Sequence, residues 1–137
     1  MSEPMTITKE HIAKVVVTGN WIIRADNDGA SHGGFCWAPL GEWTTAPDWN
    51  DRPECGGGLH GQDKDHGGYI QGTRLVFCET RGKHVAIGSN KVKVQSARIL
   101  MVNALPEGLS VGGSLDLSST AIKKVPKSAK IASMIYR

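Results

Sequence analysis

Cysteine and histidine side chains in the first eighty residues are the ones that could bind zinc. The candidate zinc ligands are Cys36, Cys55, His60 and Cys78. Structural zinc sites take thiolate and imidazole ligands in tetrahedral geometry, often from closely spaced pairs. Such a site would organise a segment without regular structure. The chain has no Cys-x2-Cys pair, however, so ordinary buried cysteines and loop histidines are the favoured interpretation. We expect no other cofactor.

The same segment could also hold a nucleophilic pair. Cys55 could be activated by His60 or His66, with Asp63 or Asp65 orienting the imidazole. Enzymes of this kind usually bring the cysteine and the histidine together from distant parts of the chain. A tight turn without catalytic chemistry is therefore the favoured interpretation.

Three tryptophans, Trp37, Trp43 and Trp49, surround this region. Each buries a large area, and the ring N–H needs a hydrogen-bond partner. They either form a core beneath a long loop or line a groove for a ligand. In an extended segment, adjacent side chains face opposite ways. We therefore expect Leu59 to point into the core and His60 to be partly enclosed on the other side.

Several short motifs resemble a known group of sequences. They are Gly34-Phe35-x-Trp37, Gly41-x-Trp43, Ala46-Pro47-Asp48-Trp49 and Cys55-Gly56-Gly57-Gly58-Leu59-His60-Gly61. Over residues 21–102 the chain resembles uncharacterised small proteins of phages and of actinobacterial or proteobacterial genomes. It is also similar to a broader domain of unknown function with a Cys-x-x-Gly-Phe-His signature. Those relatives have a second cysteine where this chain has Gly61-Gln62-Asp63, which weakens a shared metal site. The resemblance implies a phage or prophage source.

The C-terminal segment contains a short repeat. Leu105-Pro106 recurs as Val125-Pro126, and the same offset aligns Val111 with Ile131 and Leu115 with Ile135. This spacing is typical of a leucine-rich or β-solenoid coil, and it resembles leucine-rich-like repeats of phage proteins. One coil cannot bury its own apolar face, so we expect it to pack on the upstream strands as a cap.

The remaining pattern predicts mainly short strands. We expect strands at residues 12–17 and 21–24, at 75–78 and 84–87, and at 91–94 and 97–102, the first two pairs forming hairpins. The strand at 91–94 should be half exposed, because lysine and valine alternate. Residues 25–72 are rich in glycine, proline and tryptophan and read as a long loop.

The predicted fold class is mainly β, with α+β as the alternative. We expect a single small domain, in which residues 1–104 form a β-rich part with the central loop 25–72. Residues 105–137 form the leucine-rich-like, solenoid-like capping repeat on the same core. No apolar run approaches the ~20 residues of a membrane span, and no secretory signal is evident. We expect a protein of the bacterial host cytoplasm that does not enter membranes.

Charge is distributed unevenly between the two ends. Residues 1–79 have a net charge of −5, and residues 80–137, which include Lys123 and Lys124, have +8. The two parts could attract each other, or the basic part could bind an acidic protein or nucleic acid. The oligomeric state stays open.

Size, resemblance and charge favour a small phage- or prophage-encoded accessory protein that binds a host macromolecule, most readily a host protein. Inhibition of a bacterial defence system is the role this would serve. One alternative is an ADP-ribosyltransferase-like or NAD-binding enzyme in which Glu79 supplies the catalytic carboxylate; the other is a nucleic-acid-binding protein. A non-enzymatic function is favoured. The candidate binding residues are Trp37, Trp43, Trp49, His60, His66, Lys123 and Lys124.

Overall fold

The computed structural model describes residues 7–26, 38–54, 57–65, 74–88, 91–116 and 126–135. Within these ranges the chain is mainly β, as predicted, with one helix and nine strands. The elements are α1 (Lys9–Thr18), β1 (Trp21–Asp26), β2 (Trp43–Thr45), β3 (Leu59–Gly61), β4 (Arg74–Arg81), β5 (Val85–Ile87), β6 (Lys91–Val94), β7 (Ser96–Val102), β8 (Ser110–Asp116) and β9 (Lys130–Ile135). No helix in the described part of the chain is long and apolar enough to cross a membrane.

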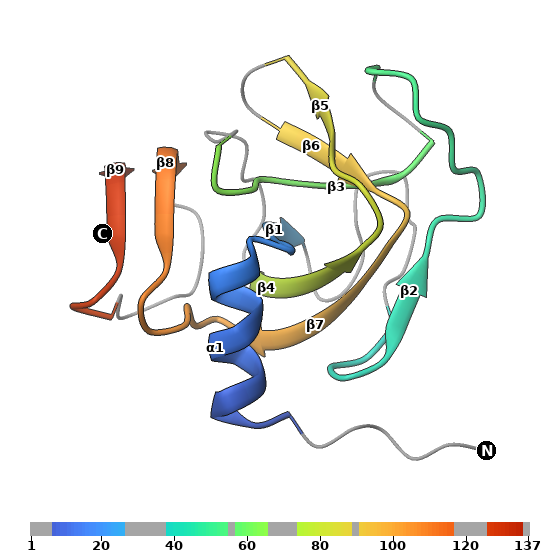
Figure 1. The fold of residues 1–137 in the computed structure, drawn as a ribbon. Helices are drawn as coiled ribbons and strands as arrows, with labels where there is room; N and C mark the ends of the chain where they lie inside the picture. Colours follow the sequence, from blue (N-terminus) through green and yellow to red (C-terminus); the bar gives the residue numbers. More distant parts are fainter. Residues whose placement is uncertain are drawn as a thin grey trace.

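An antiparallel sheet in the order β1-β4-β7-β2 forms the centre of the structure. A second antiparallel sheet, β3-β6-β5, packs on one of its faces, and α1 packs on the other. The parallel pair β8-β9 lies on the same side as α1 (Figure 1). The central sheet therefore has a helix face and a sheet face.

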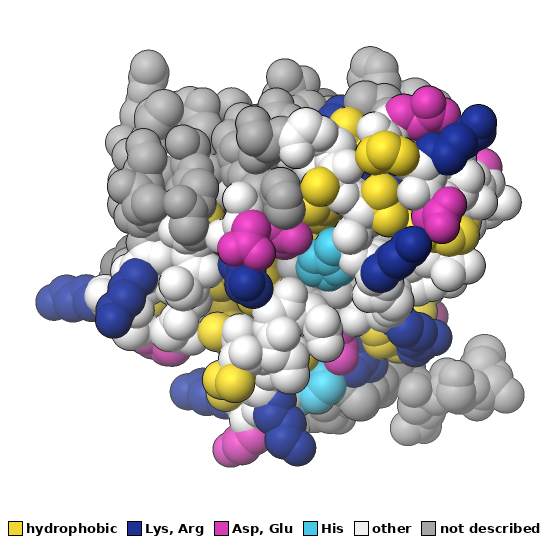
Figure 2. Space-filling model, turned by 45° about the horizontal axis from the view of Figure 1, so that its top comes forward, with side chains coloured by type: hydrophobic (Ala, Val, Ile, Leu, Met, Phe, Trp, Pro, Cys, Tyr) yellow, Lys and Arg dark blue, Asp and Glu magenta, His cyan; other side chains and the backbone are white. Residues whose placement is uncertain are grey.

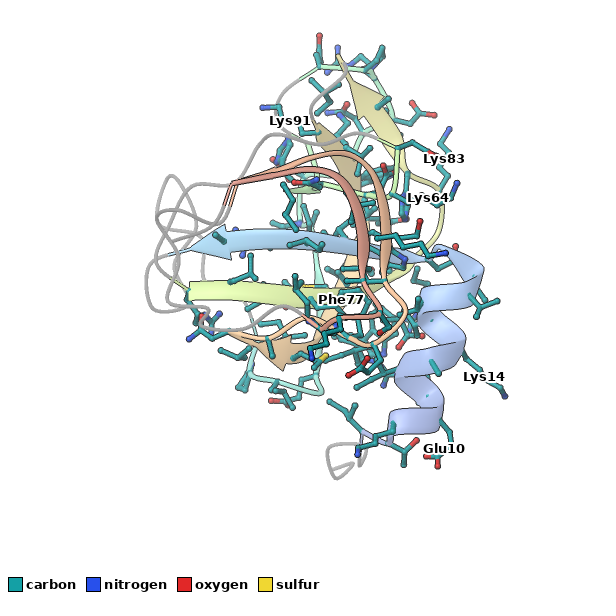
Figure 3. All side chains as sticks on the ribbon, turned by 90° about the vertical axis from the view of Figure 1, so that its left-hand side faces the viewer. Glu10, Lys14, Lys64, Phe77, Lys83 and Lys91 are labelled. Carbon is teal, nitrogen blue, oxygen red and sulfur yellow. The ribbon has the colours of Figure 1, made fainter. Side chains whose placement is uncertain are left out.

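Alternating side chains of the central strands build a separate core on each face. Trp21, Ile23 and Phe77 belong to the core under α1 and β8, whereas Ile22 and Cys78 belong to the core under the second sheet. All five are at most 1% exposed. Figure 3 shows Phe77 inside the molecule.

Residues 12–17 form a helix, so the strand predicted there is wrong. The Thr8 side chain caps the helix by accepting a hydrogen bond from the His11 N–H at 3.1 Å. Gly19 ends it in a left-handed conformation (φ 76°) and donates to the Val15 carbonyl. Between these caps, apolar residues at helical spacing face the core, and this periodicity outweighs the β-branched run.

The two predicted hairpins are also absent. β1 pairs with β4, and β4 pairs further with β7, whereas β5 pairs with β6. The strand at 21–24 pairs with a strand more than forty residues away, and the strand at 84–87 pairs with the strand that follows it in place of the one that precedes it. The predicted strands at 91–94 and 97–102 are confirmed as β6 and β7.

Segment 25–72 was predicted to be a long loop, and this prediction is wrong for its described part, which contains β2 and β3. The Gly41 N–H donates to the Ile99 carbonyl at 2.9 Å, and the Ala46 N–H donates to the Gln95 carbonyl at 2.8 Å. These bonds extend the contact of β2 with the central sheet. Backbone pairing thus organises this segment where the sequence showed no regular period.

The C-terminal repeat forms the parallel pair β8-β9. Val111 lies opposite Ile131, at the predicted offset, but Leu115 lies opposite Met134 because the register shifts between Val111 and Ser114. Leu115 is fully buried in the core under α1. The described residues form this one parallel pair and no solenoid.

Candidate functional site

Five polar or aromatic side chains from α1, β2, β4 and β7 gather on the helix face of the central sheet. They are His11, Trp43, Glu79, Arg81 and Arg98, called here the Arg–Trp cluster. Arg98 lies opposite Glu79 on β4 and opposite Trp43 on β2. Directly opposed residues of neighbouring strands face the same way, so the register itself assembles this cluster.

Arg98 and Glu79 form the interior of the Arg–Trp cluster. The Arg98 Nε and Nη2 atoms each lie 2.7 Å from Glu79 Oε1. His11 Nε2 lies 2.8 Å from the same oxygen and 3.0 Å from Arg98 Nη2, which ties α1 to the sheet. The Arg98 and Glu79 side chains are only 9% and 19% exposed, so the two charges compensate each other largely out of water.

Arg81 and Trp43 form the outer part of the Arg–Trp cluster. The guanidinium carbon of Arg81 lies 3.9 Å from the centroid of the Trp43 ring, within cation–π range, and that of Arg98 lies at 4.9 Å. Arg81 is exposed and Trp43 is half-buried. Among the described carboxylates, none forms a salt bridge with Arg81. The Trp43 ring thus restrains the guanidinium of an exposed arginine.

A second polar group connects the two sheets. His84 Nδ1 lies 3.0 Å from Asp63 Oδ2, and His84 Nε2 lies 2.8 Å from Thr80 Oγ1. This is the order of groups in a hydrolase triad. Thr80 and Asp63 are buried, however, at 6% and 5% exposure. The chain of bonds therefore joins β4 to the segment after β3, and Asp63 holds His84 where the sequence suggested His60 or His66.

His60 lies on β3, in a segment that was predicted to be a loop, but Leu59 is buried in the core and the imidazole is partly enclosed, as expected. Lys93 lies directly opposite His60 on β6. Burial lowers the pKa of His60, and the charges of Lys91 and Lys93 lower it further. Burial disfavours the charged form of the imidazole, and the neighbouring cations repel it. His60 therefore stays neutral down to a lower pH than an ordinary histidine does.

Lys93 is fully buried, although its strand was predicted to be half exposed. Trp49, Asn50 and Gly58 lie against it: Lys93 Nζ donates to Asn50 Oδ1 at 2.9 Å and lies 5.9 Å from the centroid of the Trp49 ring, and a Cβ at Gly58 would lie 3.0 Å from Lys93 Cβ. Trp49 also packs against the core between the sheets. The half-exposed prediction failed because alternation along a strand does not reveal a segment packed over its outer face.

The structure does not bring together the predicted zinc ligands that it describes. Cys78 is fully buried between the sheets, and His60 faces away from that core. No group of three or more His, Cys, Asp or Glu side chains in the described ranges could hold a metal ion. Outside the described residues lie Cys36, Trp37, Cys55, His66, Lys123 and Lys124.

Glu79 and His60 lie on opposite sides of the central sheet. Glu79 contacts His11 of α1 on the helix face, whereas β3 packs on the sheet face. The proposed catalytic carboxylate and the candidate binding residue His60 thus do not share a cleft.

The sequence reasoning identified Trp43 but not its partners Arg81, Arg98 and His11. These residues are far apart in sequence and meet only through strand register and the helix. A long-range pairing of β2 with β7 was the missing information. No protein-family model, curated protein or solved structure matches the chain, so the resemblance to phage proteins stays a prediction.

Proposed function

We propose that the chain is a non-catalytic binding protein that docks on a macromolecular partner through Arg81 and Trp43. The observation that carries this proposal is the exposed guanidinium stacked at 3.9 Å on a half-buried ring. Tryptophan and arginine are the residues most enriched among interface positions that dominate binding energy. Stacking restricts the arginine before binding, so less conformational freedom is lost when a partner arrives.

The other polar groups of the described residues support binding rather than catalysis. The hydroxyl of Thr80 is buried and bonded to His84, and Glu79 is engaged by Arg98. A nucleophile or a catalytic carboxylate must reach a substrate. Arg81, by contrast, is exposed and can reach a partner.

Three basic residues of the second half of the chain are paired or buried, which favours a protein partner over nucleic acid. Arg98 is paired with Glu79, Lys83 is paired with Asp51 at 3.2 Å, and Lys93 is buried. On the face shown in Figure 2, the described basic side chains lie among acidic ones and form no continuous basic patch. Tight nucleic-acid binding needs several cations along one surface.

The class of partner follows from the resemblance to phage proteins. It implies a bacterial host protein in the cytoplasm, and inhibition of a defence system is the role that we propose for the complex. The Arg–Trp cluster supports the binding step of this proposal, and the resemblance alone supports the role.

Capture from bacterial lysate at low salt tests the proposal with matched variants. Immobilised wild-type protein should retain one partner in stoichiometric amount, and Arg81→Ala should lose it. Lys83→Ala is the control, because Lys83 is an exposed cation two residues away (Figure 3). Equal capture by both variants, or no stoichiometric partner, would contradict the proposed function.

A further inference from the structure

We propose that the Arg81–Trp43 pair binds a carboxylate side chain on an extended acidic segment of the partner. This inference rests on the proposed function and specifies its ligand.

The donors of Arg81 suit a carboxylate. The guanidinium is planar, and its N–H groups form a fork that matches the two oxygens of a carboxylate. Contact with the Trp43 ring occupies one face of that plane, so the donors along its edge remain for a ligand. A lysine ammonium at the same position would carry the charge but not this geometry.

The surrounding charges favour one carboxylate over a polyanion. Glu79 compensates Arg98 within the Arg–Trp cluster, so Arg81 supplies the cluster's excess positive charge when His11 is neutral. Glu42, which precedes Trp43 in the sequence, is exposed and negatively charged. A phosphate backbone that passes Trp43 would approach this carboxylate, and like charges brought together cost binding energy.

The half-buried Trp43 ring adds an apolar surface beside the donors. An extended peptide places neighbouring side chains on opposite sides, so residues two apart share a side. A segment with a glutamate and an aliphatic or aromatic residue two positions away would place its carboxylate on Arg81 and its apolar side chain on Trp43.

Nuclear magnetic resonance titration with short capped peptides tests this inference directly. The probe is a pentapeptide, N-acetylated and C-amidated, with a central glutamate and a leucine two positions away; the control peptide has glutamine in place of glutamate. The glutamate peptide should shift the Arg81 Nε–H and Trp43 Nε1–H resonances. Arg81→Lys should weaken its affinity by about tenfold, which corresponds to about 1.4 kcal/mol.

Three results would overturn the carboxylate assignment. They are equal binding of the two peptides, unchanged affinity in Arg81→Lys, and tighter binding at the same resonances by an oligonucleotide of about ten nucleotides. Lys83→Gln should leave peptide binding unchanged. If Arg81→Ala still loses the lysate partner while the peptides fail, the carboxylate assignment is wrong and the proposed function stands. If the lysate experiment itself fails, the proposed function is wrong.

Discussion

At the scale of single residues, Glu79 joins three parts of the molecule. One of its oxygens lies within hydrogen-bond distance of both Arg98 and His11, which belong to β7 and α1. A carboxylate in this position holds the arginine in place against the Trp43 ring. Glu79 therefore positions the proposed binding surface without contacting the partner.

Replacing Glu79 by glutamine should lower the free energy of unfolding by about 3 kcal/mol, because the buried Arg98 charge loses its counter-charge. Urea unfolding measures this change. The double variant Glu79→Gln/Arg98→Met should recover a large part of the loss, since no uncompensated charge remains. Unchanged stability in the single variant would show that water already screens the pair.

His60 should make the stability depend on pH. Its pKa in the folded protein is below the ordinary value of 6.5, so the unfolded chain takes up the proton first as the pH falls. The free energy of unfolding should therefore decrease below about pH 7, until the folded protein is also protonated. Other groups add their own dependence, but they are common to wild type and His60→Gln. The variant should lose less stability between pH 7 and pH 5, and parallel profiles would contradict the prediction.

At the scale of elements, the described residues of segment 46–58, which are 46–54 and 57–58, cover the outer face of β6 at Lys93. Within this segment, the Asn50 N–H donates a hydrogen bond to the Gly57 carbonyl at 2.9 Å and so holds residues 50 and 57 together. The Asn50 side chain then accepts from Lys93. This arrangement depends on the absence of a side chain at position 57, where a Cβ would lie 1.9 Å from Asn50 Nδ2.

Alanine substitutions at two glycines separate the packing of this segment from backbone strain. Gly57 and Gly82 both have positive φ, 68° and 86°, but a Cβ at Gly82 would meet nothing within 4 Å. Gly82→Ala should cost about 1–2 kcal/mol from the left-handed conformation alone. Gly57→Ala should cost more in thermal or urea unfolding, because Asn50 must also leave Lys93. Equal losses of stability in the two variants would mean that Asn50 can move away from Lys93 without destabilising the protein.

Local pattern predicted some elements and not others. β6 and β7 follow runs of β-branched and apolar residues, and the sequence predicted both. α1 was missed because the three valines at 15–17 suggested a strand, although Thr8 and Gly19 supply the end signals of a helix. The burial of Lys93 and the pairing of β2 with β7 depend on contacts between distant segments, which the alternation of residue types does not encode.

The same limit applies to the candidate site. Residue type predicted Trp43 as a candidate binding residue. The glycines beside His60 and its place next to Leu59 predicted that its imidazole is partly enclosed. Arg81, by contrast, looked like one residue of a turn between two strands of a hairpin. Its role emerged only when β4 and β2 were placed beside β7 in the same sheet.

At the scale of the whole molecule, the central sheet needs cover on both faces. The second sheet provides it on one side, and α1 together with β8 provides it on the other. Leu109 is fully buried in the latter core. The C-terminal segment thus contributes to the common core that holds the central sheet.

Leu109→Ala should therefore lower the free energy of unfolding by about 2–5 kcal/mol, through lost burial and an incompletely filled cavity. Val17→Ala is the control, since Val17 is 86% exposed on α1. That control should change the stability by no more than about 0.5 kcal/mol. A similarly small effect at Leu109 would show that the C-terminal segment does not support the core.

Site-specific photo-crosslinking tests the proposed binding surface most directly. A photoreactive phenylalanine analogue replaces the exposed Glu42, beside Trp43, or the exposed Lys127, just before β9. β2 and β9 lie at opposite sides of the molecule in Figure 1. Irradiation in bacterial lysate should give one protein adduct from position 42, absent in the Arg81→Ala background, and none from position 127. An adduct from position 127 alone, or one at position 42 that persists without Arg81, would contradict the account.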